Sequence, residues 1–260
     1  MEQTAETSAV PTGKRARNRL ARHSDYLQTA LRIATADGLE ALTMQRLADE
    51  VDAAVGTVYT YFPSKGALLA EVQREAIDRI LGSYLLLRPD VEARVADADP
   101  TTAALTHLVA FGRFWIASLD TYPQEQHLLQ QLMNDSRRAV PDDELGRVLP
   151  AILRLLDLAR VRFDVATQAG ALSSGDPMDR TITLAAALSG VLGVGKLDRW
   201  DVDLLDGRRL GLGLIDDLLR GWGASSGDLT AAHAVLDAIA RQHPLARPLL
   251  PNDALLEETP

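Results

Sequence analysis

The chain has 260 residues, a formal net charge of −9 and 47% hydrophobic residues, which is enough apolar material to bury the core of one large or two ordinary domains. It contains no cysteine, which excludes a disulfide framework, a thiolate metal site and a cysteine nucleophile. No apolar run approaches the roughly 18 residues of a membrane span and no signal-peptide pattern opens the chain, so we expect a cytoplasmic protein with no membrane partner.

The first segment is basic. Residues 14–74 hold nine Lys/Arg and seven Asp/Glu, a net charge of +2, whereas the rest of the chain carries −11. A basic arm can lie along phosphates or in a minor groove of DNA, and its contribution falls with salt. The alternative is a solvated tail. We assign residues 1–23 as a flexible basic arm, whose cations are Lys14, Arg15, Arg17, Arg19 and Arg22.

Apolar residues with a helical period predict four helices after the arm. The first is capped by Ser24 and ends at Gly38, and the second is capped by Thr43. The third is short, covering about 55–61. The fourth begins near Ser64 and ends at about Leu87, since Arg88-Pro89 follows.

The second and third helices have the pattern of a helix-turn-helix, in which the later helix enters the major groove of DNA. The outward face of the third helix carries Gly, Thr and Tyr, which suit a DNA groove better than solvent. Gly56 lets the backbone approach DNA, Thr57 offers a hydroxyl, and Tyr59 can touch a base edge or a thymine methyl group. Thr60 and Tyr61 can donate hydrogen bonds to phosphates.

The first turns of the second and fourth helices, next to the third, supply further candidates for DNA contact. Lys65 adds its charge to the free N–H groups at the start of the fourth helix, and together they form an anion site. Thr43, Gln45 and Arg46 hold the same position in the second helix. Each residue also has an ordinary interpretation, with Tyr59 and Tyr61 as core aromatics and Lys65 as a solvated side chain. Their combination at this spacing favours DNA binding.

Residues 24–70, centred on the sequence GTVYTYFPSKGALL at 56–69, resemble the DNA-binding domain of the TetR family of bacterial transcriptional regulators. The resemblance implies a homodimer on a palindromic double-stranded DNA operator. It implies a repressor that a small-molecule effector of unknown identity releases. It also implies base contacts by Gly56, Thr57 and Tyr59, and backbone contacts by Thr43, Gln45, Thr60, Tyr61 and Lys65.

The turn departs from the family pattern. It reads Asp52-Ala53-Ala54 where Gly-Val-Ser is usual. Asp52 tolerates a left-handed conformation at some cost, whereas Ala54 cannot cap the third helix, a loss of about 1 kcal/mol. Val55 replaces a residue that is often polar. The operator sequence therefore cannot be inferred from the operators of relatives.

The rest of the chain reads as helix after an acidic loop at 89–100, and no strand alternation is evident. We therefore predict an all-α fold, with an N-terminal three-helix helix-turn-helix domain and a larger C-terminal ligand-binding and dimerisation domain. The domains are 24–70 and 71–243, and residues 244–260 form a loosely attached, Pro-rich acidic tail. The later helices are expected at about 101–121, 124–138, 143–171, 178–197, 206–222 and 229–241.

Aromatic residues on one helix suggest a ligand pocket, because such pockets are largely apolar with a few polar groups. The alternative is that most of them are core or surface residues. A buried arginine facing a cavity would indicate an anionic ligand. The candidates are His107, Phe111, Phe114, Trp115, Met133, Arg137 and Phe163, with His127, Arg162 and Gln168 as further possibilities.

Two helices are candidates for the dimer interface, because one carries a small-residue face and the other an apolar stripe. The alternative is an internal helix pair within one subunit. The expected contacts are Ala185, Leu188, Leu192, Leu212, Ile215 and Leu219, and the small-residue face includes Ala186, Ser189, Gly190 and Gly193.

Two other function classes have some support in the sequence. Residues 223–227 match the G-x-S-x-G pattern of a hydrolase nucleophile elbow, but that turn needs a preceding strand, and residues 214–220 have a helical period. We therefore predict no enzyme, no cofactor and no metal, since the histidines lack metal-ligand spacing. A DNA-binding regulator that answers to a protein partner instead of a small molecule remains the alternative.

Overall fold

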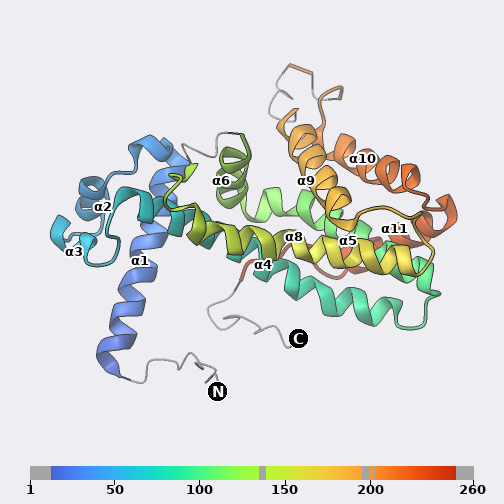
Figure 1. The fold of residues 1–260 in the computed structure, drawn as a ribbon, viewed down its shortest axis with the longest axis horizontal. Helices are drawn as coiled ribbons and strands as arrows, with labels where there is room; N and C mark the ends of the chain where they lie inside the picture. Colours follow the sequence, from blue (N-terminus) through green and yellow to red (C-terminus); the bar gives the residue numbers. More distant parts are fainter. Residues whose placement is uncertain (1–12, 135–138, 195–199, 202, 250–260) are drawn as a thin grey trace, which may run out of the picture.

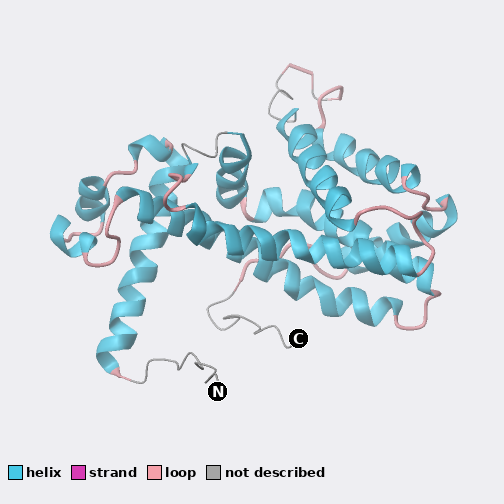
Figure 2. Ribbon diagram, in the orientation of Figure 1, coloured by secondary structure: helices cyan, strands magenta, loops and turns pink. Residues whose placement is uncertain are grey.

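The computed structural model describes residues 13–134, 139–194, 200–201 and 203–249. Within these ranges all regular elements are helical, which confirms the all-α prediction (Figure 2). The elements are α1 (Lys14–Asp37), the 3-10 turn η1 (Leu39–Ala41), α2 (Met44–Glu50), α3 (Val55–Tyr59), α4 (Lys65–Val95), α5 (Pro100–Thr121), α6 (Pro123–Asn134), α8 (Leu145–Gln168), α9 (Pro177–Val194), α10 (Gly207–Gly221) and α11 (Ser226–Ala240).

The helices form a small N-terminal group and a larger bundle, and α4 runs from one into the other (Figure 1). In the small group, α1, α2 and the start of α4 surround a core in which Leu31, Leu47 and Phe62 are buried. In the larger bundle, the apolar helix α5 packs against α4, α6, α8, α10 and α11. By length and composition α5 could cross a membrane, but 72% of its most apolar window is buried within the fold, as in the core helix of a bundle.

Local signals at the helix ends are confirmed. Gly38 ends α1 with φ +88°, a conformation that glycine adopts without steric cost. The Thr43 hydroxyl accepts a hydrogen bond from the Arg46 N–H at 3.1 Å, and the Ser64 hydroxyl accepts one from the Ala67 N–H at 2.9 Å. These caps satisfy donors that have no partner inside the helix.

The predicted start of the first helix is wrong. α1 begins at Lys14, so the basic residues 14–22 are exposed positions on a helix, and Ser24 lies inside it. Residues 1–12 of the predicted arm lie outside the described residues. The run contains no glycine or proline after Gly13, and Arg, Ala and Leu are strong helix formers, which explains why the helix extends so far.

The predicted end of the fourth helix is also wrong, because α4 continues through Pro89 to Val95 and replaces much of the expected loop. A proline inside a helix costs about 3 kcal/mol. Burial of Leu87, Val91 and Val95 on either side of it offsets that cost, at roughly 1.5–3 kcal/mol per fully buried side chain. Tertiary packing therefore outweighs the helix-breaking tendency of Pro89.

The later helices lie close to their predicted ranges. α8 carries Pro150 within its second turn, and α6 is described as far as Asn134, so its expected continuation to residue 138 lies outside the described residues. Close approaches between helices depend on two glycines: a Cβ at Gly112 of α5 would lie 2.6 Å from Ile215, and one at Gly211 of α10 would lie 3.1 Å from Ile116.

The first part of the predicted loose tail is firmly attached, which corrects that assignment for residues 244–249, here called the C-terminal strap. Its Arg247 N–H donates to the Ser83 hydroxyl at 3.1 Å, and the same hydroxyl donates to the Arg247 carbonyl at 2.7 Å. The Tyr122 hydroxyl donates to that carbonyl at 2.9 Å and accepts from the Leu249 N–H at 3.0 Å. Residues 250–260 lie outside the described residues.

Replacing Ser83 by alanine should lower the free energy of unfolding by about 1–3 kcal/mol, because both backbone groups of Arg247 lose a buried partner. The matched control is Ser24→Ala, an exposed position inside α1, which should leave stability unchanged or slightly higher. Urea unfolding followed by circular dichroism measures both. Equal stability of the two variants would show that the C-terminal strap contributes little.

Candidate DNA-binding surface and effector cavities

The turn between α2 and α3 has the geometry that the sequence indicated. Asp52 adopts φ +50°, the left-handed conformation that glycine usually supplies. Ala54 stands at the N-cap of α3 and gives no side-chain hydrogen bond. Val58 and Phe62 are buried beneath α3 and hold it against the domain, so its opposite side faces outward.

The outward side of α3 presents three of the predicted base-reading or phosphate-binding residues. Tyr59 is 49% exposed, and Gly56 and Thr60 are also exposed. No atom lies within 4 Å of the place where a Cβ on Gly56 would stand. Thr57 is half-buried, and the Thr60 hydroxyl donates its single hydrogen to the Thr57 carbonyl at 2.7 Å, so its predicted donation to a phosphate would have to replace this bond. This side of the helix has room for another molecule to approach.

Tyr61 is mainly a packing residue. Its ring meets Tyr26 edge-on with centroids 5.1 Å apart, and the Arg19 guanidinium lies 5.9 Å above it. The ring therefore joins α1 to the loop after α3, and the core interpretation describes it best. Its predicted phosphate contact is not needed to explain its position.

The other predicted DNA contacts lie at helix starts. Gln45 is exposed and its Nε2 donates to Asp49 at 2.8 Å, whereas Arg46 pairs with Asp37. Lys65, the first residue of α4, lies 3.9 Å from Glu40 and is partly exposed. Both cations therefore have an intramolecular carboxylate partner that a phosphate would have to displace. Sequence reasoning missed these pairs because the partners come from a different element.

The larger bundle encloses an apolar cavity of about 320 Å³ between α4, α5, α6, α8 and α9. Of the predicted ligand residues, Trp115 and Met133 line it. It is otherwise lined mainly by aliphatic side chains that the aromatic signal did not single out, among them Ile77, Leu129, Ile152 and Leu156. Such residues share the helical period of every core position, so no sequence signal distinguishes them.

The remaining ligand candidates do not line this cavity. Phe111, Phe114 and Phe163 are core residues, with Phe111 and Phe114 packed edge-on against Tyr84 at centroid distances of 5.4 and 5.2 Å. His107 is buried on α5. Arg137 lies outside the described residues.

Four of the six predicted dimer contacts are buried within the subunit and therefore are not available to a partner in this structure. Leu188, Leu192, Ile215 and Leu219 pack in the chain's own core, because α9 and α10 lie against each other and against α8 and α5. Ala185 lines the apolar cavity. Leu212 alone among the six is exposed, at 38%.

An exposed face remains on the same two helices. Ile182, Ala186 and Gly190 follow one another at i, i+4 and i+8 on α9, and all three are exposed. A Cβ at Gly190 or Gly193 would meet no atom within 4 Å. Helix α10, which packs against α9, carries the exposed Leu212.

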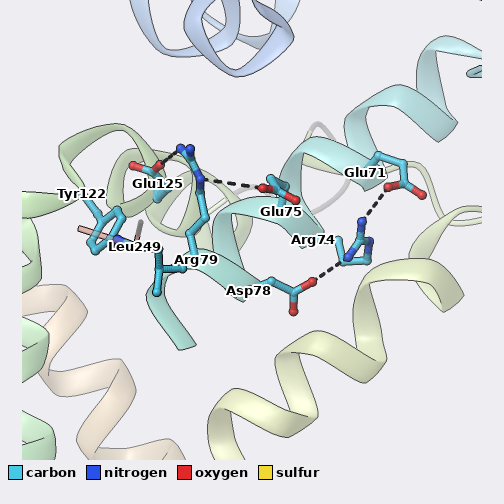
Figure 3. Close-up of polar contacts among 8 residues, drawn as sticks. All are labelled: Glu71, Arg74, Glu75, Asp78, Arg79, Tyr122, Glu125 and Leu249. Atoms are coloured by element: carbon cyan, nitrogen blue, oxygen red, sulfur yellow. Dashed lines mark hydrogen bonds and ion pairs between the residues drawn. The ribbon is translucent and has the colours of Figure 1, made fainter. Parts of the chain in front are cut away.

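Ion pairs hold α4 to other helices of the larger bundle, and Figure 3 shows the one between Arg79 and Glu125. Arg79 pairs with the buried Glu125 of α6 at 2.7 Å and with Glu75 at 3.7 Å. Asp78 accepts from Arg74 at 2.6 Å and also from Arg154 of α8 at 2.8 Å. The middle of α4 is thus tied to α6 and to α8 through charge-assisted hydrogen bonds.

The hydrolase pattern at 223–227 has a structural role. The Ser225 hydroxyl caps α11 by accepting from the Asp228 N–H at 3.1 Å, and the helix α10, not a strand, precedes it. Gly223 adopts φ +108° between the two helices. The segment is a helix connection and lacks the geometry of a nucleophile elbow.

Comparison with known proteins matches residues 27–72 to the family described as bacterial regulatory proteins, tetR family. Over 178 residues, which are 65% of this chain and 72% of the relative, the chain is 28% identical to the HTH-type transcriptional repressor KstR of Mycolicibacterium smegmatis. Over 59 residues, 23% of this chain and 28% of the relative, it is 41% identical to KstR of Rhodococcus jostii.

Solved structures share the fold at low sequence identity. The regulator FadR from Bacillus subtilis, solved in complex with stearoyl-CoA, has a TM-score of 0.55 and 14% identity, covering 74% of this chain and 97% of that one. A bacterial regulatory protein of the tetR family from Rhodococcus RHA1 has a TM-score of 0.56 and 14% identity, covering 78% and 98%.

His107 generates a prediction for the pH dependence of stability. Burial, with Arg162 as the next cause, lowers the pKa of its imidazole from 6.5 to about 4. Between these values the unfolded chain binds a proton that the folded chain does not, so the free energy of unfolding falls as the pH falls. The loss from this residue between pH 7 and pH 5.5 is about 1 kcal/mol.

The variant His107→Leu should therefore lose about 1 kcal/mol less than the unchanged protein over that interval. Urea unfolding at both pH values measures the difference, and titrations common to the two proteins cancel. Parallel pH profiles would show that His107 is protonated equally easily in the folded and unfolded states.

Proposed function

The chain belongs, through its DNA-binding domain, to the TetR family of bacterial regulatory proteins, and on that premise we propose that it is a homodimeric repressor that a small molecule releases from an inverted-repeat operator. The observation that carries this proposal is the exposed side of α3, where Gly56 and Tyr59 face outward from a rigidly packed helix-turn-helix. The KstR relatives are named as repressors, which supports repression rather than activation of transcription.

Base recognition is assigned to Gly56, Thr57 and Tyr59. A recognition helix reads base edges with side chains that reach into the major groove, and here the ring of Tyr59 is the largest group available. Thr43, Gln45, Thr60 and Lys65 flank that side at helix starts and ends, which suits contacts to the DNA backbone. Arg46 pairs with Asp37 and Tyr61 packs against Tyr26, so each would have to leave its partner before it could contact the DNA backbone.

The basic face of α1 is a further candidate for phosphate contact. Lys14, Arg15, Arg19 and Arg22 are exposed on its first turns, although the molecule as a whole is acidic. A helix displays these cations at fixed positions, unlike the flexible arm that the sequence suggested. Phosphate neutralisation by such residues makes affinity fall steeply with salt.

Dimerisation is assigned to the exposed face of α9 and α10. Small residues at Ala186, Gly190 and Gly193 permit close approach of a second helix, and Ile182 and Leu212 supply apolar contact. Two copies related by a two-fold axis would bury this face against itself. The operator would then repeat the recognition sequence in inverted order.

Release by a small molecule requires that effector binding and DNA binding share an element. That element is α4, which starts at Lys65 beside α3 and lines the apolar cavity with Ile77. A ligand that favours one position of α4 over another shifts the DNA affinity by that difference in binding free energy. FadR, which shares the fold and was solved in complex with stearoyl-CoA, supports the proposal that a small molecule binds this chain.

Selection of the purified full-length protein on random duplex DNA, followed by sequencing of the bound pool, tests the proposed function. We expect an enriched inverted repeat. Folded protein that enriches no sequence at low salt would contradict sequence-specific DNA binding. A single, unrepeated half-site would contradict the dimer.

The selected duplex then separates base reading from phosphate contact. Tyr59→Ala should reduce discrimination between bases at particular operator positions, by about 1–3 kcal/mol at each, because the ring no longer reaches them. Lys65→Ala should weaken binding to all sequences about equally and make it less dependent on salt. Fluorescence anisotropy against single-base variants at several salt concentrations measures both, and identical patterns for the two variants would mean that α3 docks differently.

The dimer assignment predicts that Gly190→Glu abolishes self-association, since it places a charge at the centre of the small-residue face. The matched control is Gly146→Glu, which is also on an exposed helical position with no atom near its Cβ. Light scattering after size-exclusion chromatography gives the mass of each variant. A dimeric Gly190→Glu variant would place the interface elsewhere.

A further inference from the structure

A second, larger hollow of about 690 Å³ lies between α4 and α8, distinct from the apolar cavity. Its wall on α8 is one face of that helix, because Leu153, Arg154, Val161 and Arg162 recur at the spacing of one helical side. Tyr84 of α4 is among the residues on the opposite wall. We call this hollow the α4–α8 groove.

The α4–α8 groove is rich in cations. Arg88, Arg154 and Arg162 line it, with Asp157 as the single lining carboxylate. Asp157 pairs with Arg160, which lies outside the lining. The charged lining therefore carries an excess of two positive charges before neighbouring carboxylates are counted.

Neighbouring carboxylates compensate these cations unequally. Arg154 has a close partner in Asp78 at 2.8 Å. Arg88 and Arg162 instead share one carboxylate, Glu92, at 3.4 and 3.6 Å, longer than the roughly 2.7–2.9 Å of a well-formed charge-assisted hydrogen bond. Two guanidinium groups beside one carboxylate leave a unit of positive charge at this end of the groove.

One donor group at the same end is also unsatisfied. The Nε of Arg88 is buried and has no hydrogen-bond partner among the described residues. A buried donor without a partner is costly, and an anionic oxygen would satisfy it. Burial and the nearby Arg162 lower the pKa of the His107 imidazole, which is therefore neutral at neutral pH and adds no charge near Arg162.

The rest of the groove is apolar. Leu153 and Val161 line it while 48% and 39% exposed, and Met178 of α9 lies at its side. Large apolar side chains that remain exposed in a concave surface mark a place where another apolar group binds. A ligand that matches the α4–α8 groove therefore has an anionic end and an apolar end.

We propose that the α4–α8 groove binds an organic anion with an apolar body, whose carboxylate or phosphate group lies between Arg88 and Arg162 and whose body covers Leu153 and Val161. The apolar cavity does not suit such a ligand, because its polar lining consists of Gln126, Gln130 and Ser189 with no charged side chain. Binding is a property of the helical bundle alone, and the proposal rests on the proposed function only for its effect on DNA affinity.

Isothermal titration calorimetry of the full-length protein with dodecanoate, dodecyl phosphate, dodecanol and dodecyltrimethylammonium tests the ligand class. At least one of the two anions should bind about tenfold or more tightly than dodecanol, since it gains a charge-assisted hydrogen bond, and the cation should bind more weakly still. Preference between the two anions distinguishes a carboxylate from a phosphate source. Equal binding of dodecanol and both anions, or no anion binding, would overturn the proposal.

Variants locate the site. Arg162→Gln and Arg88→Gln should each weaken anion binding about tenfold and leave dodecanol unchanged. Arg160→Gln is the matched control, because its side chain is on α8 and pairs with Asp157 but does not line the groove. Leu153→Ser should weaken the binding of anions and dodecanol alike. Circular dichroism melting curves establish that each variant is folded.

A second pair of measurements separates the groove from the apolar cavity and from DNA binding. Ser189→Phe fills the apolar cavity and should leave anion binding intact; loss of binding there would move the site into that cavity. Anion binding that persists without any change in affinity for the selected operator would retain the groove as a ligand site. It would refute only the link between this site and the release of DNA.

Discussion

The position of α4 is the constraint on which both parts of the molecule depend. Its first turns complete the core beneath α3, where Phe62 and Leu68 are buried. Its middle is tied to α6 by Arg79–Glu125 and to α8 by Asp78–Arg154. Because the helix is continuous from Lys65 to Val95, a displacement at one end cannot be absorbed by a loop before it reaches the other.

A second contact joins the two parts away from the axis of α4. The N-cap residue Ser64 donates to Glu144 at 3.4 Å, and a Cβ at Gly66 would lie 3.1 Å from Pro141. The segment that leads into α8 therefore touches the turn that follows α3. Helix α8 carries one wall of the α4–α8 groove, so the helix-turn-helix domain meets the helices that line this groove at two places, along α4 and through this segment.

Sequence reasoning succeeded where the signal is local and failed where tertiary packing decides. The stop at Gly38, the cap at Thr43 and the left-handed Asp52 each depend on one residue and its immediate neighbours. The passage of α4 through Pro89 depends on burial against other helices, which no local pattern reports. The same limit explains the dimer candidates, because an apolar stripe such as that of Ile215 looks alike whether it faces a partner subunit or the chain's own core.

The C-terminal strap also bears on the order in which the chain folds during synthesis. The contacts of the helix-turn-helix core are separated by a few tens of residues at most, whereas Ser83 meets Arg247 across 164 residues of sequence. Contacts between distant residues form late, and domains emerging from the ribosome fold from the N-terminus. The helix-turn-helix core can therefore form on the ribosome, while Ser83 and Tyr122 of the bundle cannot make these hydrogen bonds until residue 247 has been translated.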